Sequence, residues 1–579
     1  MARFLHVRRS ELERTLEVAG FAMLVGWAMY TAFNATQAIF LYKAGPQAYP
    51  LFFIVLALAV WPLVALQGAL TRRFGVGRTL RYNLVLNAIA APILFVVYRI
   101  SEAPAVAFAI YVVYSVAFEL VMLNFWAFVS QYFNVLEGKR VFPVIAAGSS
   151  IGYILSGVTT TVVAIIATEP LLFVWMIGAA AAAYMSAWLE RRLYRPSLAD
   201  DADELLAREH AVTHKHGPIQ LVRAAFQYVT GSRLVLALIV LAFALQIASR
   251  TGDYLVAQIF VQATHSNLQA LTILLGNAWL ASYVVQLGIS LFITPIVLDR
   301  LGVKNAIMAL PVFTLIGFAA VAINPILATS LFLFIVRNGL QTGLDDPAES
   351  VLGGALPAQV GPKLTVLLNN LVLPGAAVTT GIVLVVVQRL TTESVQVLAL
   401  FGLVISVLFI LAAFNVRRLY VGAIYSRLRS HALSLSDFQQ ALGRPTQSQI
   451  DELVEFIRVG DEKARRFAAG MLGELSPDTL TSMLPEMLNM EDPVIRRLAL
   501  ELAQPGKVSD DQLNAAADDA DGWVIAAAAV AGAKRDQPWE RSKKLLGDLW
   551  DSSNDNYRGS GVGGAVPGRR RPGRRRPEG

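Results

Sequence analysis

The sequence predicts an all-α, polytopic membrane protein with twelve transmembrane helices in two six-helix halves, followed by a cytoplasmic α-solenoid. Of its 579 residues, 55% are hydrophobic and 16% are charged, and the mean hydropathy of +0.53 is too high for a soluble globular protein. A short loop pattern occurs twice, about 227 residues apart, which indicates two related halves. After residue 418 the composition becomes that of a soluble helical domain with an internal repeat.

The repeated loop pattern joins two long apolar stretches in each half. Its first copy reads Gly68-Ala-Leu-Thr-Arg-Arg-Phe-Gly-Val-Gly-Arg78 and its second reads Pro295-Ile-Val-Leu-Asp-Arg-Leu-Gly-Val-Lys304. Basic residues followed by glycine are typical of a tight cytoplasmic turn between membrane helices. The candidate loop and gate residues are Arg72, Arg73, Gly75, Arg78, Asp299, Arg300 and Gly302.

About 20 mostly apolar residues are needed for a helix to cross roughly 30 Å of hydrocarbon. Twelve segments qualify: 17–41, 49–71, 79–99, 104–133, 141–168, 170–193, 232–262, 268–298, 303–324, 326–350, 363–388 and 394–417. Helices are expected rather than strands, because unpaired backbone groups cost several kcal/mol in lipid.

Lysine and arginine concentrate in alternate loops, which predicts that both termini and the long middle loop lie in the cytoplasm. We expect an inner-membrane protein of bacterial type, without a cleavable signal peptide. The predicted organisation is an amphipathic lead-in (1–16), the N-terminal bundle (17–194), a linker (195–230), the C-terminal bundle (231–418), a second linker (419–444), helical repeats (445–550) and a disordered basic tail (551–579).

The helical repeats are predicted from a phrase that recurs about 31 residues apart. Asp461-Glu-Lys-Ala-Arg-Arg-Phe-Ala-Ala matches Asp492-Pro-Val-Ile-Arg-Arg-Leu-Ala-Leu, and a third, degenerate copy begins at Asp521. Asp is expected to cap each helix, and stacked helix pairs bury apolar faces that no single pair can bury. This segment resembles a short HEAT-type solenoid, which is a candidate surface for a cytoplasmic protein.

Ionisable side chains in the middle of a membrane cost at least about 2.5 to 3.5 kcal/mol and are functional candidates. The candidate substrate-binding residues are Asn34, Gln37, Glu119, Asn124, Arg250, Asp253, Arg337, Asn338, Asn369 and Asn370. Asp345, Asp346 and Glu349 are candidate gate residues at the cytoplasmic end of the tenth span.

Each candidate also has a structural interpretation. Arg250 and Asp253 are three residues apart, so they are either an ion pair that locks helices or a ligand clamp. The amides are either substrate contacts or interhelical hydrogen-bond partners. His210, His214 and His216 lie in a charged loop without other metal ligands, so no metal site and no cofactor are expected. The basic tail predicts nonspecific attraction to anions and no specific nucleic acid.

The sequence contains neither cysteine nor a P-loop, His-Glu-x-x-His or Gly-x-Ser-x-Gly motif, so an enzyme is not expected. Residues 133–152, with Lys139-Arg-Val-Phe-Pro143 and Ala147-Gly-Ser-Ser-Ile-Gly152, resemble the entry to the fifth span of the ATP/ADP translocase-like branch of the major facilitator superfamily. Asp253-Tyr254 and 344–357 are similar to further phrases of that branch. This resemblance implies the fold of that superfamily and transport of a nucleotide.

Two departures from that branch concern its charges. Its first span usually carries an arginine cluster, where this chain has Phe33-Asn-Ala-Thr-Gln37, and its eleventh span carries charges that 364–380 lacks. The expected function is therefore secondary transport of a small solute, anionic or nucleotide-like, with Arg250 and Arg337 attracting it. The alternative is a membrane scaffold or sensor that recruits a protein through its repeats.

Overall fold

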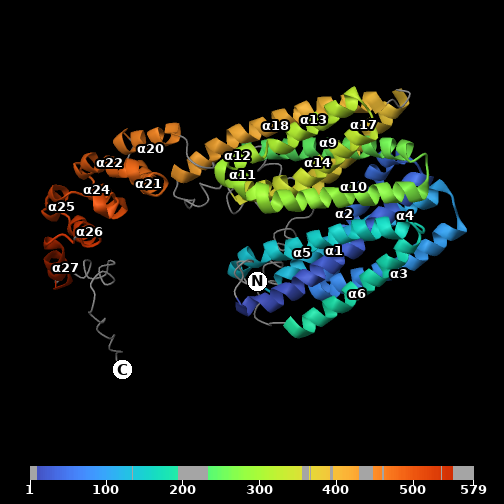
Figure 1. The fold of residues 1–579 in the computed structure, drawn as a ribbon, viewed down its shortest axis with the longest axis horizontal. Helices are drawn as coiled ribbons and strands as arrows, with labels where there is room; N and C mark the ends of the chain where they lie inside the picture. Colours follow the sequence, from blue (N-terminus) through green and yellow to red (C-terminus); the bar gives the residue numbers. More distant parts are fainter. Residues whose placement is uncertain are drawn as a thin grey trace. The chain divides into compact units, whose positions relative to one another are not determined.

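The structure is a computed structural model that describes residues 9–133, 135–193, 233–354, 364–365, 367–390, 395–429, 447–459, 462–535 and 538–551 (Figure 1). The chain divides into two compact units, at Val421 and Gly422. The predicted central linker with its three histidines, most of the second linker and the basic tail lie outside the described residues.

The N-terminal half of the first unit consists of six long helices. They are α1 (Arg9–Lys43), α2 (Tyr49–Phe74), α3 (Val76–Ile100), α4 (Pro104–Ser130), α5 (Val135–Ala164) and α6 (Pro170–Leu193), with a 3₁₀ turn η1 (Pro46–Ala48) before α2. Of the predicted amphipathic lead-in (1–16), residues 9–16 form the first turns of α1. Thr15 Oγ1 donates to Glu11 O at 2.7 Å, so these turns form a regular helix.

The C-terminal half has interrupted helices. Its elements are α9 (Arg233–Ala263), α10 (Leu268–Gly288), η2 (Ile289–Ile293), α11 (Thr294–Arg300), α12 (Val303–Ala306), α13 (Ala309–Ile323), α14 (Leu327–Leu340), η3 (Gln341–Asp345), α15 (Asp346–Gly354), η4 (Leu368–Val372), α17 (Leu373–Leu390) and α18 (Val395–Arg429). The segments η2, η3 and η4 are single π-helical turns. Such turns are rare, and they often occur at functional sites.

Ten helices among the described residues are long and apolar enough to cross a membrane, where the sequence predicted twelve spans. The predicted tenth span continues as a helix through η3 and α15, but polar residues from Arg337 to Glu349 lower its hydropathy. Residues 355–363 are not described, and the predicted eleventh span contributes only the shorter apolar helix 373–389. The chain is a multi-pass membrane protein.

The repeated loop pattern places a glycine at the same kind of turn in both halves. Gly75 joins α2 to α3 with φ +80° and ψ +162°, and Gly302 precedes α12 with φ +72° and ψ +165°. A side chain is strained at such a positive φ, so glycine is required at both positions. The two copies therefore share backbone conformation as well as sequence.

Helices α1 and α5 pack closely along their length (Figure 1). Glycines on α5 make this possible: a Cβ built on Gly148 would lie 2.5 Å from Ala19 O, and one built on Gly152 would lie 2.2 Å from Met23 O. Small residues allow such close backbone approach in membrane helix pairs, where packing and not hydrophobic burial drives association.

Gly152→Ala is therefore expected to destabilise the first unit by about 1 to 3 kcal/mol, because overpacking forces backbones apart. The matched control is Gly375→Ala, since a Cβ at Gly375 meets nothing within 4 Å. Thermal unfolding of the purified protein in detergent measures both variants. Equal midpoints for the two would contradict this account of α1–α5 packing.

The two halves meet at the end of the unit where α5 finishes and α2 and α10 begin, which we call the contact end. Here α5 packs on α10 and α2 packs on α17. Thr161 Oγ1 donates to Asn277 Oδ1 at 3.0 Å, and the hydroxyls of Thr168 and Thr272 lie 2.8 Å apart. At the other end, which carries Arg72, Arg73 and Arg300 and is called the basic end, α11, α12 and α15 pack against elements of their own half.

The second unit is a stack of helix pairs. Its helices are α20 (Gln447–Val459), α21 (Glu462–Leu475), α22 (Pro477–Ser482), α23 (Leu484–Leu488), α24 (Pro493–Leu502), α25 (Asp510–Ala517), α26 (Gly522–Ala533) and α27 (Arg541–Asp551), with a 3₁₀ turn η5 (Pro505–Lys507). Helices α21, α24 and α26 pack in succession. Asp492 and Asp521 cap α24 and α26 through Val494 N and Trp523 N, as expected. The expected cap Asp461 is outside the described residues.

Arginine–aspartate pairs connect successive repeats of the second unit. Arg466 donates to both carboxylate oxygens of Asp492 at 2.9 and 3.0 Å, and Arg496 donates to both oxygens of Asp519 at 2.8 and 2.9 Å. Bidentate guanidinium–carboxylate pairs are stronger and more directional than single hydrogen bonds. Each pair therefore fixes how one repeat sits on the next.

Acid is expected to loosen this stack. The hydrogen bonds from Arg466 are the main cause that lowers the pKa of Asp492. A lowered pKa in the folded state gives stability that is present above the unfolded pKa of about 3.9 and is lost as the pH falls through the folded value. Hydrogen exchange of α24 amides in the whole protein, corrected for intrinsic rates, measures this. Arg466→Gln should weaken protection already at neutral pH and reduce its further loss below about pH 4.

Candidate polar layer between the two halves

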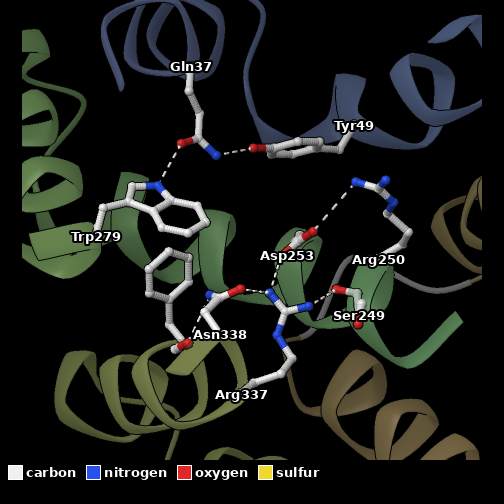
Figure 2. A network of polar contacts seen from close by, with 9 residues as sticks. Gln37, Tyr49, Ser249, Arg250, Asp253, Trp279, Arg337 and Asn338 are labelled. Carbon is white, nitrogen blue, oxygen red and sulfur yellow. Dashed lines mark hydrogen bonds and ion pairs between the residues drawn. The ribbon is translucent and has the colours of Figure 1, made fainter. Parts of the chain in front are cut away.

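A polar layer at the contact end contains the buried Arg337 of α14 (Figure 2). Its guanidinium forms an ion pair with Asp253 of α9, donates to Ser249 O at 2.8 Å and donates to Asn338 Oδ1 at 3.3 Å. Arg337 is only 4% exposed. A charge this buried requires a partner, and Asp253 supplies it.

Arg250 is farther from Asp253 than the three-residue spacing on one helix predicts for a close ion pair. Its Nη1 lies 3.8 Å from Asp253 Oδ2, while Asp253 pairs closely with Arg337. The expected ion pair between Arg250 and Asp253 is present but loose, because α14 brings a second and more buried cation, Arg337, to the same carboxylate. The Arg250 guanidinium lies 5.2 Å from the centre of the Phe53 ring of α2, in the other half.

Gln37 links the two halves through its side-chain amide. Trp279 Nε1 of α10 donates to Gln37 Oε1 at 3.3 Å, and Gln37 Nε2 donates to the Tyr49 hydroxyl at 2.7 Å (Figure 2). Nearby, Gln388 Nε2 donates to the Tyr254 hydroxyl at 2.6 Å and to Gln47 O at 3.2 Å. Hydrogen bonds thus cross between the halves at α1–α10 and at η1–α17.

Aromatic rings continue this layer toward the centre of the unit. The Tyr30 ring lies 4.3 Å from that of Tyr153 and 5.5 Å from that of Tyr283, and Trp279 stacks on Tyr283 at 5.5 Å. Phe33 meets Trp279 edge-on at 5.4 Å. Tyrosine and tryptophan combine an apolar ring with a polar atom, so this cluster can contact a solute through either.

Glu119 of α4 has an exposed side chain, and the described residues give it neither an ion pair nor a hydrogen bond. Its carboxylate interacts electrostatically with Arg250 and with the hydroxyls of Tyr30 and Tyr114. Both tyrosines lie where α1 meets α4: the Tyr30 ring is 5.4 Å from that of Phe118, and the Tyr114 hydroxyl donates to Met29 O at 2.5 Å. The charge of Glu119 is therefore within electrostatic range of the aromatic cluster and of Arg250 in the second half.

Three acidic residues follow the π turn η3. Asp345 is buried, whereas Asp346 and Glu349 have exposed side chains, and the charge of Asp346 reaches Tyr30 of the other half. The π turn also brings Gly343 O to the Thr294 hydroxyl, which donates to it at 2.5 Å. Of these carboxylates, Asp346 is thus within electrostatic range of the aromatic cluster in the other half.

The remaining predicted residues do not join the layer. Asn34 donates to Thr160 Oγ1 at 3.0 Å within the N-terminal half, and Asn124 accepts from Thr71 at 3.3 Å while donating to Leu120 O. Asn369 is exposed on η4, and the side chain of Asn370 is outside the described set. Of the loop residues, Arg72, Arg73, Arg78, Asp299 and Arg300 are exposed at the basic end, with Gly75 and Gly302 in the turns between them.

The aromatic residues of this layer, Tyr49 included, were not among the site candidates, which were chosen because they carry a charge or an amide. A signal was present, because Tyr30 and Phe33, and likewise Trp279 and Tyr283, are three or four residues apart and share a helix face. No group of His, Asp and Glu that could hold a metal occurs among the residues that the structure describes.

No protein-family model matches this chain, and no curated protein matches its sequence. Solved structures do resemble it. A mutant of the nucleoside transporter NupG is 17% identical, with 70% of this chain and 99% of that chain covered and a TM-score of 0.50. An auto-inhibited POT family peptide transporter is 13% identical, with 71% and 97% covered and a TM-score of 0.50. The xylose transporter XylE from E. coli is 12% identical, with 68% and 94% covered and a TM-score of 0.46.

At such low identity the likeness concerns the fold alone. The first unit, with its two helical halves meeting at a polar and aromatic layer, shares its fold with these transporter structures.

Proposed function

We propose that this protein is a secondary active transporter that moves a small solute by alternating access between its two halves. The observation that carries the proposal is the distribution of contacts: polar and aromatic side chains join the halves at the contact end. Toward the basic end, Asp346 has an exposed side chain, and its charge is within electrostatic range of Tyr30 in the other half. Such an arrangement encloses a polar site in the middle of the membrane, where transporters bind their solutes.

The side that is open follows from the charges of the loops. Arginine-rich short loops stay in the cytoplasm, so the basic end is the cytoplasmic one and the contact end faces outward. The conformation is therefore closed toward the outside. Transport requires the layer of Gln37, Tyr49 and Trp279 to separate while the basic ends of the two halves approach.

The charges that line this space favour a solute with a neutral or cationic group next to an aromatic or polar body. Glu119, Asp346 and Glu349 are acidic, and Arg337 is already paired with Asp253. A nucleotide with several negative charges requires several cations, and among the candidates Arg250 alone remains half-exposed. The nucleotide specificity implied by the ATP/ADP translocase-like phrases is thus the less favoured form of this proposal.

The test is uptake by proteoliposomes that contain the purified protein. The panel should contain ATP and ADP, nucleosides, di- and tripeptides, amino acids, sugars and organic cations, each with a proton gradient and without one. We expect saturable uptake of one class outside the nucleotides. Glu119→Gln should lower that uptake at least about tenfold, because an ionisable side chain within a membrane span costs free energy and is a functional candidate. Glu102→Gln is the control, since Glu102 is exposed outside the spans and pairs with Lys43 at 2.8 Å.

One observation favours the scaffold alternative: Arg337 and Asp253 satisfy one another as a structural pair would. If the protein is a scaffold, deletion of 445–535 removes its cellular role, whereas Glu119→Gln and Arg250→Ala leave that role intact. The transport proposal expects the reverse pattern. A lack of uptake across the whole panel, together with the first pattern, would reject transport.

A further inference from the structure

A groove on the first unit runs between α9 and α18, on the membrane-facing surface. It has a volume of about 480 Å³ and is lined by Val240, Phe243, Ala244, Ile247, Ile405, Leu408, Leu411, Ala412 and Asn415. All of these except Asn415 are apolar. Val240, Leu408 and Leu411 are 50%, 51% and 59% exposed, so the groove is open to its surroundings. Both helices cross the membrane, so those surroundings are lipid chains.

The groove has the length of one bilayer leaflet. From Ile405 to Asn415 the rise of an α-helix amounts to about 15 Å. That is half of the roughly 30 Å hydrocarbon thickness. An acyl chain that lies along α18 would therefore begin near Asn415 and end near the middle of the membrane.

Arginines mark the same end of the groove on both helices. Arg418 follows Leu411 by seven residues, and Arg233 precedes Val240 by seven, so each lies on the helix face that lines the groove. Both side chains are exposed. Asn415 lies between the apolar lining and Arg418, which gives the expected order of apolar chain, polar backbone and anionic headgroup. Arg417, on an adjacent face, is within electrostatic range of Lys304, which adds positive charge at this end.

We propose that this groove binds one phospholipid with an anionic headgroup, taken from the leaflet at the basic end. One acyl chain fills the apolar groove between α9 and α18, and the phosphate contacts Arg233 and Arg418. The site depends on charge complementarity at one end and on apolar burial along its length, and it does not depend on the proposed transport. Neutral lipids satisfy only the second requirement.

The experiment uses the full-length protein in nanodiscs with phosphatidylglycerol that carries a photoactivatable group at the acyl terminus. After illumination, mass spectrometry maps the labelled peptides. We expect label on 240–247 and 405–415, displaced by unlabelled phosphatidylglycerol and not by phosphatidylcholine. Arg233→Gln combined with Arg418→Gln should reduce that label roughly tenfold, because each arginine contributes through its attraction to anionic lipid. The matched control is Arg78→Gln with Arg300→Gln, since these arginines are also exposed at the basic end.

A second variant tests the apolar part. Val240→Trp fills the groove from a half-exposed position, so it should fold normally and lose the label while both arginines remain. Equal displacement by the two lipids would overturn the proposal, and so would unchanged labelling in the double arginine variant, because the groove would then hold only ordinary surrounding lipid. Loss of label in the Arg78 and Arg300 control would overturn it as well, since the attraction would then belong to the whole basic end.

Discussion

Arg337→Met is expected to reduce uptake at least about a hundredfold and to destabilise the first unit by about 3 kcal/mol, because Asp253 then keeps only its looser contact with Arg250. The substitution also removes the hydrogen bond to Ser249 O at 2.8 Å, so α14 loses a polar contact with α9. Uptake in proteoliposomes measures the first effect, and thermal unfolding in detergent measures the second.

The double variant Arg337→Met with Asp253→Asn separates structure from function. Removing both charges should restore most of the stability, since the buried cation is gone and Arg250, which is 31% exposed, keeps its contact with the Phe53 ring. Uptake should stay low if the pair has to open and close during transport. Recovery of both stability and uptake would contradict this role and would assign the pair to helix packing alone. Ser330→Ala, at a buried site on the same helix, is the matched control.

Gly157→Leu is expected to shift the protein away from the conformation described here. A Cβ at Gly157 would lie 2.7 Å from Leu280 Cβ and 3.0 Å from Gly276 O, so a larger side chain forces α5 and α10 apart at the contact end. The outward-open state becomes favoured because only that state relieves the overlap. The chain has no native cysteine, so two introduced cysteines are the only labelling sites.

Spin labels at Ala105 and Asn324 measure this shift, since both residues are exposed near the contact end on different halves. The distance distribution should lengthen in Gly157→Leu. Gly288→Ala should leave it unchanged, since a Cβ there meets nothing within 4 Å. An unaltered distribution in Gly157→Leu, with folding intact, would argue against a moving contact end.

Hydropathy was a reliable guide to most helices of the first unit, because a chain in lipid has few other ways to pair its backbone N–H and C=O groups. The tenth and eleventh spans remain predictions, because polar residues lie around the π turns η3 and η4 and part of the eleventh span is outside the described residues. The repeated glycine turn was recognisable because positive φ restricts the residue type, and Gly75 and Gly302 adopt nearly the same angles. The caps Asp492 and Asp521 were recognisable for a similar local reason.

The site was harder to predict, because partners there come from helices far apart in sequence. Spacing along α9 paired Asp253 with Arg250, whereas packing paired it with Arg337, which is 84 residues away. Gln37 was a candidate by its polarity alone, and nothing in the sequence linked it to Trp279, 242 residues later. Asn34 and Asn124 looked equivalent to Gln37 and were instead satisfied inside their own half.

Sequence alone predicts that this chain enters a membrane many times as helices, that its two halves share a turn, and that a second helical unit follows. These properties depend on composition and local periodicity, which each segment carries alone. Three-dimensional packing is needed to tell which costly charges are neutralised and at which end the two halves touch. Those outcomes depend on distances between helices, and only the packing of the whole unit sets such distances.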